Sequence, residues 1–385
     1  MENKIKILYI ISNFGGGGAE KIISDLAIRI NKENYEPLIV SLGNYDKSLT
    51  EKWDKILNFY NIEHFIFDRT NGAHKIKTIL NLRKIIKIYK PDIIHTNYCG
   101  SIFYSALSST GIKVKMINTF HSTSGFSLKD KIILRIFRSK FKHFVCVSKS
   151  VKEVIEKSFK IKSEDISVIY NGIDLKAFDP HQNEKKVKDK LVFLSIGRLS
   201  KEKGFDILLN ALSKLNLPSN VYFEIAGDGS LKQDLKEMII KKGLEGQVKL
   251  LGNVNHDNIP QLLWSANVYV MPSLFEGFGI SLIEAMASGK PLILSDIDSF
   301  KEVLGLYDLN FLNGFAITKF GVMFEVGNPE ALVNALKWML ENKDKWETFG
   351  KNSYERAKEF DISKFVQKYE LLYRKLIQKY EGGHL

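Results

Sequence analysis

The sequence predicts an α/β protein built from two doubly wound domains, each a parallel sheet covered by helices. Its 385 residues exceed what a single hydrophobic core usually holds. Short β-branched runs alternate with amphipathic segments, and the alternation pauses at a polar stretch, residues 178–190, before it starts again. Strands and helices in alternation form right-handed βαβ units, which build doubly wound sheets.

The first half, residues 1–180, contains the strands and helices expected of one such domain. The predicted buried strands are residues 4–11, 36–42, 92–96, 114–120 and 143–148. The predicted amphipathic helices are residues 19–30, 78–89 and 129–141. The first apolar run is too short to span a membrane and lacks a small-residue cleavage site, so we expect a strand and not a signal peptide.

The second half, residues 181–360, repeats the pattern. Its predicted strands are residues 190–199, 221–227, 248–252, 268–273 and 290–296, and its helices 206–215, 230–243, 259–266 and 280–289. Residues 361–385 are expected to form one amphipathic helix with Asp361 as its N-cap, and this helix is expected to pack against one of the two domains. Ligands of doubly wound sheets bind beyond the carboxyl ends of the strands, so we expect the site in a cleft between the facing domains.

Composition indicates a folded protein, and charge distinguishes its halves. Apolar residues make up 44% and aromatic residues 11%, which argues against global disorder. Cys99 and Cys146 match no metal-ligand spacing and are expected to be reduced apolar fillers. Residues 1–180 hold 29 basic and 18 acidic side chains, net +11, whereas residues 181–385 hold 27 and 26, net +1.

Two basic helical segments account for much of this excess. Residues 129–142 carry Lys131, Arg135, Arg138 and Lys142 at helical spacing, and residues 74–90 are similarly basic. Such helices suit the surface of an anionic membrane, although solvated lysines above a packed apolar face are the alternative. A nucleic-acid partner is not expected, because no helix-turn-helix, RRM or zinc pattern occurs and the basic helices lack interleaved aromatics.

Three motifs carry the chemistry. Gly15 to Gly18 lie between a strand and a helix, where backbone amides can approach an anion, though a simple tight turn is equally compatible. Arg198 and Lys203 lie just beyond a strand, with Gly204 opening the next helix, and could neutralise a diphosphate unless they are merely exposed loop charges.

The third motif is FEGFGISLIEA, residues 275–285. Gly277 and Gly279 leave amides open at a positive helix end, where phosphate oxygens bind. Glu284, one turn into the helix, can accept hydrogen bonds from paired ribose hydroxyls, and Glu276 from sugar hydroxyls. Two solvated glutamates on a surface helix are the alternative, which the flanking glycines disfavour.

The spacing of Glu276 and Glu284 resembles the E-x7-E motif of retaining glycosyltransferase family 4, whose members have the GT-B fold with two Rossmann-like domains. The resemblance continues, in the family's order, through GGGGAE, NTFHS, VIYNGID, GRLSKEKG and AGDGSLKQDL, and covers nearly the whole chain. One departure is Ser230, which stands where a proline often follows the glycine pair and puts the base contact in doubt.

The resemblance implies a role for each matching residue. Catalytic positions are His121, at the end of a strand of the first domain, the diphosphate-binding pair Arg198 and Lys203, and Glu276, which holds the donor sugar. The remaining positions bind the donor. Gly16 and Gly17 match positions at the distal phosphate and the sugar, and Glu284 matches the ribose ligand. The base is bracketed by Gly227, Gly229, Asn253 and Val254, and the phosphates are bound at Phe278, Gly279 and Ile280.

No cofactor or metal is expected. Asp296 and Asp298 spell the metal-binding DxD of another glycosyltransferase fold, but Arg198 and Lys203 already supply positive charge, so we expect a turn there. His95 and His143 are expected to be satisfied structural histidines.

The resemblance favours front-face transfer with retention, from UDP-hexose or UDP-N-acetylhexosamine to a glycan or lipid-linked glycan, by a cytoplasmic enzyme on the inner membrane face. The alternatives are a GDP-mannose-dependent mannosyltransferase, a nucleotide-sugar epimerase of similar architecture and a non-catalytic nucleotide-sugar sensor.

Overall fold

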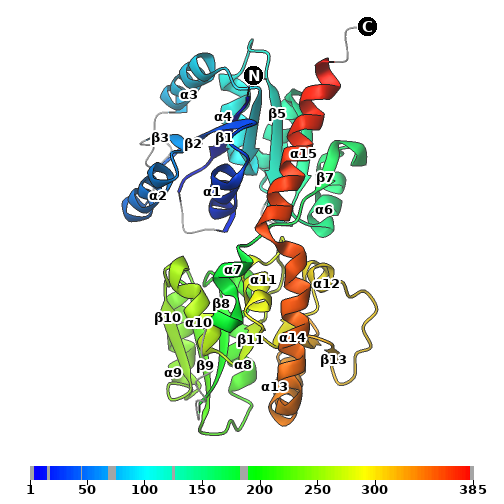
Figure 1. The fold of residues 1–385 in the computed structure, drawn as a ribbon. Helices are drawn as coiled ribbons and strands as arrows, with labels where there is room; N and C mark the ends of the chain where they lie inside the picture. Colours follow the sequence, from blue (N-terminus) through cyan, green and yellow to red (C-terminus); the bar gives the residue numbers. More distant parts are fainter. Residues whose placement is uncertain are drawn as a thin grey trace. The chain divides into compact units, whose positions relative to one another are not determined.

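The computed structural model describes residues 4–14, 18–44, 46–67, 75–123, 126–182 and 190–381 (Figure 1). The chain divides into two compact units, residues 1–172 together with 363–385, and residues 173–362. The expected doubly wound α/β fold is confirmed in both.

The first unit contains a seven-stranded parallel sheet in the order β3-β2-β1-β4-β5-β6-β7. Its strands are β1 Ile5–Ile11, β2 Tyr35–Ser41, β3 Glu63–Ile66, β4 Ile93–Asn97, β5 Lys115–Phe120, β6 Phe141–Cys146 and β7 Ile166–Val168. Its helices are α1 Gly18–Arg29, α2 Lys47–Phe59, α3 Lys75–Tyr89, α4 Tyr98–Ser108, α5 Leu128–Phe137, α6 Lys149–Phe159 and α15 Ile362–Glu381. Helix α4 packs between α3 and α5.

Burial follows strand position. The central strand β1 has five consecutive buried residues, as expected where helices cover both faces of a parallel sheet. The edge strand β3 alternates between exposed and half-buried residues. Successive strands are added in one direction from β1 to β3 and in the other from β4 to β7, so the topological switch point lies between β1 and β4.

The second unit contains a seven-stranded sheet in the order β10-β9-β8-β11-β12-β14-β13, parallel except for the β13–β14 pair. Its strands are β8 Leu191–Ile196, β9 Val221–Ala226, β10 Val248–Gly252, β11 Val268–Met271, β12 Leu292–Ser295, β13 Phe315–Thr318 and β14 Gly321–Phe324. Its helices are α7 Leu175–Phe178, α8 Phe205–Leu212, α9 Lys232–Lys241, α10 Ile259–Ser265, α11 Ile280–Ala287, α12 Asp298–Leu304, α13 Pro329–Glu341 and α14 Trp346–Ala357. Here the switch point lies between β8 and β11.

One predicted helix is shorter than expected. The segment 129–142 is helical only to Phe137, continues as a 3-10 turn over Arg138–Lys140, and enters β6 at Phe141. Lys142 therefore lies on a strand and not on a basic helix. The β-branched and aromatic run that starts at Phe141 favours the sheet over a longer helix.

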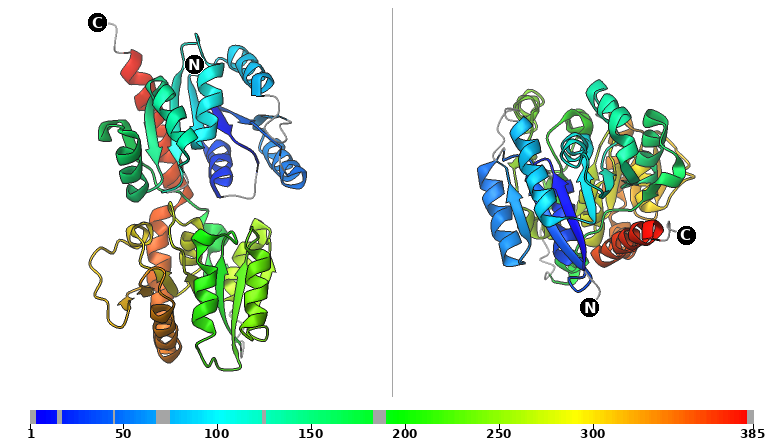
Figure 2. Two further views of the ribbon diagram at one scale, coloured as in Figure 1. Left: turned by 180° about the vertical axis from the view of Figure 1, so that it is seen from behind. Right: turned by 90° about the horizontal axis from the view of Figure 1, so that it is seen from above.

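Helix α15 completes the first unit, and Figure 2 shows it lying along the sheet. The Tyr373 hydroxyl lies 2.7 Å from His95 Nδ1 on β4, and the Tyr369 hydroxyl lies 3.0 Å from Thr119 Oγ1 on β5. The Arg374 Nε donates to the Tyr35 hydroxyl on β2 at 3.1 Å. A helix from the far end of the sequence thus satisfies buried polar groups on three strands.

Candidate functional site

The second unit has its candidate site at the switch point, in the loops that follow β8 and β11. The Leu274 amide donates to the Glu202 carbonyl at 2.8 Å and holds the two loops together. Gly204 has φ +64°, and a Cβ there would lie 2.0 Å from the Pro272 carbonyl oxygen. Only glycine permits this close approach, so its position in the sequence sets the geometry of the site.

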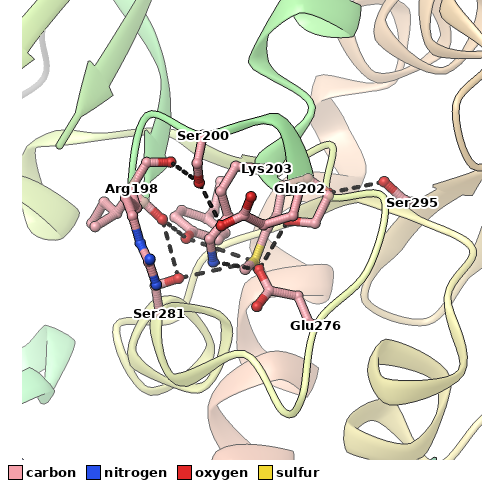
Figure 3. A network of polar contacts seen from close by, with 11 residues as sticks. Arg198, Ser200, Glu202, Lys203, Glu276, Ser281 and Ser295 are labelled. Carbon is pink, nitrogen blue, oxygen red and sulfur yellow. Dashed lines mark hydrogen bonds and ion pairs between the residues drawn. The ribbon is translucent and has the colours of Figure 1, made fainter. Parts of the chain in front are cut away.

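Lys203 and Glu276 meet across these loops (Figure 3). Lys203 Nζ lies 2.5 Å from Glu276 Oε1, which also accepts from Ser273 Oγ at 3.0 Å. The two side chains are only 16% and 12% exposed. The lysine stem lies over Gly197, where a Cβ would lie 3.4 Å from its Cδ and Cε. The structure therefore brings together two predicted residues 73 positions apart and holds a cation in a defined place.

Arg198 lies on the same loop and is exposed, which leaves its guanidinium accessible to an anion. Glu202 lies near both basic residues and accepts from Ser200 Oγ at 2.5 Å. Partial burial on its own would raise the pKa of Glu202. The Ser200 hydrogen bond, a backbone amide and the charges of Arg198 and Lys203 outweigh that effect and hold its pKa below the usual range. Sequence analysis did not identify this third charged group.

Glycines also hold the loops after β8, β9 and β10 in close contact. The Gly197 amide donates to the Ala226 carbonyl at 3.0 Å, and the Gly227 amide to the Gly252 carbonyl at 2.8 Å. A Cβ on Gly227 would lie 1.9 Å from the Gly197 carbonyl oxygen, and one on Gly229 would lie 2.4 Å from the Leu199 carbonyl oxygen. The predicted base-binding glycines therefore have a packing role. Asn253 and Val254 follow at the carboxyl end of β10, exposed and half-buried respectively.

Helix α11 begins at this site, as predicted. Its N-cap, Gly279, has φ +90° and caps no amide with a side chain, so the first turn presents its backbone N–H groups. Ile280 is the first helical residue and is half-buried. The Phe278 ring is buried against Phe360 at a centroid distance of 5.6 Å, so any donor contact from Phe278 would come from its backbone.

Glu284 lies in the first turns of α11 and is 5% exposed. His256, in the 3-10 turn His256–Asn258 after β10, places Nε2 3.0 Å from Glu284 Oε1. None of the sequence motifs pointed to His256, because it lies 28 residues from Glu284 and outside any recognisable spacing. The pair fixes the orientation of a carboxylate that the motif assigns to ribose hydroxyls.

In the first unit, His121 directly follows β5, as predicted. Its Nε2 lies 2.9 Å from Oδ1 of Asn97, the last residue of β4, and its ring lies 5.2 Å from the ring of Tyr98. Burial lowers the pKa of His121 to about 4, so its imidazole is neutral near pH 7. Gly16 and Gly17 lie outside the described residues.

The other residues considered as ligands have structural partners. His95 is fully buried between the Tyr373 and Thr119 hydroxyls, so the expectation of a satisfied core histidine is confirmed. His143 Nε2 lies 2.8 Å from Ser167 Oγ. Asp296 and Asp298 both form ion pairs with Lys301, at 3.3 and 3.1 Å. Cys99 and Cys146 are free and buried, as expected.

Sequence comparison identifies relatives over almost the whole chain. Residues 16–177 match the family described as Glycosyltransferase Family 4, and residues 178–356 match the one described as Glycosyl transferases group 1. An uncharacterized glycosyltransferase of Methanocaldococcus jannaschii is 29% identical over 88% of this chain and 93% of its own. The UDP-Gal:alpha-D-GlcNAc-diphosphoundecaprenol alpha-1,3-galactosyltransferase of Escherichia coli is 31% identical over 70% of this chain and 71% of its own.

Solved structures share the fold. A glycosyltransferase from Rickettsia africae superposes with a TM-score of 0.80 at 24% identity, covering 97% of this chain and 99% of its own. Anabaena HepE in complex with UDP superposes with a TM-score of 0.78 at 22% identity, covering 96% and 100%. Fold, motifs and relatives agree that the chain belongs to glycosyltransferase family 4, has the GT-B fold, and transfers a sugar from a nucleotide sugar.

Proposed function

We propose that this chain is a retaining, metal-independent glycosyltransferase that moves a hexose or N-acetylhexosamine from a UDP-sugar to a lipid-linked glycan. The observation that carries the proposal is the Lys203–Glu276 ion pair at the switch point. Lys203 and the neighbouring Arg198 provide positive charge that stabilises a diphosphate leaving group, and Glu276 is oriented to accept hydrogen bonds from hydroxyls of the donor sugar.

The arrangement around Glu276 favours front-face transfer over a covalent intermediate. One oxygen of Glu276 receives hydrogen bonds from both Lys203 and Ser273, which makes the carboxylate a poor nucleophile. A retaining double displacement needs a second, free carboxyl group about 5 Å away. The other two carboxylates of the site are engaged, Glu202 with Ser200 Oγ and Glu284 with His256 Nε2. Glu276 therefore holds the sugar, and the leaving phosphate takes the acceptor proton as the new glycosidic bond forms on the same face.

The names of relatives support the donor and acceptor classes. The Escherichia coli relative is named for UDP-Gal and a diphosphoundecaprenol acceptor. A Schizosaccharomyces pombe relative, 26% identical over 91% of this chain, is a phosphatidylinositol N-acetylglucosaminyltransferase subunit. Both names combine a hexose or N-acetylhexosamine with a lipid-borne acceptor, and we extend that pairing to this chain.

A lipid-linked acceptor requires access to a membrane surface, and α3 and α5 provide a suitable one. Ile133 and Leu134 of α5 are buried, whereas Leu128, Ile132 and Ile136 form an outward stripe, 75%, 50% and 62% exposed. On α3, Ile76, Leu80 and Ile88 are likewise exposed. We call these six side chains the outer stripe. Neighbouring lysines and arginines flank it, and Asp130 is the single acidic residue of the two helices.

The outer stripe therefore suits peripheral binding to an anionic bilayer, with apolar side chains in the interface and cations among the headgroups. No helix in the described ranges has the length and hydropathy needed to cross a bilayer.

The function is tested by incubating the protein with a panel of UDP- and GDP-sugars and a diphosphopolyprenyl-linked N-acetylglucosamine, with and without EDTA. We expect a new glycoside with the donor's anomeric configuration, formed equally well in EDTA. An inverted product would overturn retention, loss of turnover in EDTA would overturn metal independence, and sugar isomerisation without transfer would identify an epimerase.

The membrane surface is tested by liposome flotation with anionic and neutral vesicles. We expect binding to anionic vesicles that Ile132→Ser weakens several-fold and salt reduces. Ile240→Ser is the control, because Ile240 is 63% exposed on α9 of the second unit, where Asp234 and Glu237 offset most of the lysine charge. Equal binding by both variants, or no binding to anionic vesicles, would retire the outer stripe as a membrane surface.

A further inference from the structure

Asn97 has an unusual place in the first unit. It is the N-cap residue of α4, a position where asparagine normally accepts a hydrogen bond from an amide of the first turn. Its side chain makes no such bond. Instead, Oδ1 lies 2.9 Å from His121 Nε2, across from the end of β4 to the end of β5.

The surroundings of Asn97 indicate that this contact is specific. The side chain is 1% exposed, and within the described parts of the chain its Nδ2 has no hydrogen-bond partner. The next residue, Tyr98, has φ +66°, in the left-handed region that bulky residues rarely adopt. A forgone cap, an unpaired buried amide and a strained neighbour all accompany the one polar contact that the Asn97 side chain makes in the described chain, the contact to His121.

We infer that Asn97 is a positioning residue that fixes His121 as the Nε2–H tautomer, so that Nδ1 accepts a hydrogen bond from a hydroxyl of a sugar substrate. A neutral imidazole has one donor and one acceptor nitrogen. Because Nε2–H donates to Asn97 Oδ1, the lone pair is on Nδ1, for which no partner occurs among the described residues. The Tyr98 ring against the imidazole restricts its rotation.

The assignment separates two tasks within the proposed function, on which it rests. His121 is neutral near pH 7 and adds no charge at a diphosphate, so it contributes hydroxyl recognition. Within the described chain His121 interacts electrostatically with His95, whose own pKa burial lowers to about 3. His95 is therefore neutral near pH 7, and burial, not a nearby ion, keeps His121 neutral.

The tautomer is measured directly by long-range ¹H–¹⁵N correlation NMR of ¹⁵N-histidine-labelled protein, with His121 assigned by its loss in His121→Gln. We expect a protonated Nε2 and an unprotonated Nδ1 in the wild type, and a mixture of tautomers in Asn97→Ala. An Nδ1–H tautomer in the wild type, or an unchanged spectrum in Asn97→Ala, would overturn the assignment whether or not the protein is active.

Kinetics test the consequence. Asn97→Ala should lower kcat about 10- to 100-fold, an effect of the size found when a group that orients a metal-ligating histidine is removed. Asn97→Asp places a carboxylate beside the imidazole, raises the pKa of His121, and should move the acidic limb of kcat/KM upward by about one pH unit or more. Wild-type kcat in Asn97→Ala and an unshifted limb in Asn97→Asp would remove the positioning role.

Asn118→Ala is the matched control. Asn118 is also buried, on the neighbouring strand, and its Nδ2 likewise lacks a partner in the described chain, but its Oδ1 accepts from Thr96 at 2.8 Å. It should change neither the His121 tautomer nor the pH profile. If Asn118→Ala changes the His121 tautomer and the pH profile as Asn97→Ala does, the effect is structural and Asn97 is not a positioning residue. If the panel of nucleotide sugars yields no glycoside while the tautomer is as expected, the proposed function fails and the assignment of the His121 tautomer to Asn97 stands.

Discussion

The two units place candidate functional residues at the same point of the same architecture, yet the chemistry there is opposite in kind. At the β8/β11 switch point of the second unit, the loops carry Arg198, Glu202 and the Lys203–Glu276 ion pair. Beside the β1/β4 switch point of the first unit stand Asn97, Tyr98 and a neutral His121. The net charges of the two sequence halves show the opposite contrast. Residues 1–180, which form most of the first unit, carry net +11, whereas residues 181–385, which contain most of the second unit and α15, carry net +1.

This contrast teaches that the net charge of a domain says little about the charge of its site. The basic excess of the first half lies partly on α3 and α5, around the outer stripe. The nearly neutral second half concentrates cations where a diphosphate would bind.

Removing the cation of the second unit should have the largest effect. Lys203→Ala should lower turnover roughly 10²- to 10³-fold, because one preorganised charge-stabilising donor is lost. Lys201→Ala, on the same turn but exposed, is the control and should keep wild-type turnover. Since Lys203→Ala also leaves Glu276 without its ion-pair partner, Lys203→Gln is measured beside it, with Tm for each. Full activity in both Lys203 variants would show that the diphosphate is stabilised elsewhere.

The next largest effect should be a loss of stability when the glycine contacts that hold the site of the second unit are disturbed. Gly204→Ala puts a methyl group 2.0 Å from the Pro272 carbonyl oxygen, a backbone atom that cannot move aside, and should destabilise the unit by about 3 kcal/mol or more. Gly243→Ala has a comparable left-handed φ, +65° against +64°, with nothing within 4 Å, and should cost only about 1 kcal/mol. Chemical denaturation compares the two, and equal losses would mean that backbone strain, not the loop contact, makes glycine necessary at Gly204.

The smallest effect concerns pH and should be confined to the first unit. Burial, with the charge of His121, lowers the pKa of His95 to about 3 in the folded state, whereas an unfolded histidine titrates near 6.5. Between these values the unfolded chain binds more protons, so folding stability falls as the pH drops from about 6.5 toward 3. Denaturation at about pH 7 and about pH 5 should show this loss, and His95→Gln should reduce the pH dependence.

The exposed His181 provides the control for that measurement, since His181→Gln should leave the pH dependence unchanged. A pH dependence identical in all three proteins would mean that carboxylates, not His95, dominate the acid limb.

Much of this fold could be predicted from apolar periodicity. All ten predicted strands are present, because long β-branched runs such as that of β1 are buried on both faces and leave a strong signal. The strands missed, β3, β7, β13 and β14, have three or four residues each, and β13 pairs antiparallel at an edge. Their positions depend on neighbouring strands more than on their own sequence.

The charged part of the site was predictable for a different reason. Arg198, Lys203 and Glu276 lie in motifs with glycines that mark strand-to-helix turns, and the structure brings Lys203 and Glu276 into contact. Asn97 and His256 were not predictable, because each acts through one contact with a residue distant in sequence. Tyr98 gives no local sign of its left-handed backbone, since that conformation is typical of glycine and asparagine and not tyrosine.

Helix α15 has a consequence for exchanging parts between related enzymes. The family matches meet at residues 177 and 178 and end at residue 356, before this helix begins. A chimaera joined once at that boundary would import a foreign α15, and its residues at positions 369 and 373 would have to satisfy this chain's Thr119 and His95. Grafting a new first unit therefore requires two junctions, the second near residue 362, so that the helix is exchanged together with the sheet it completes.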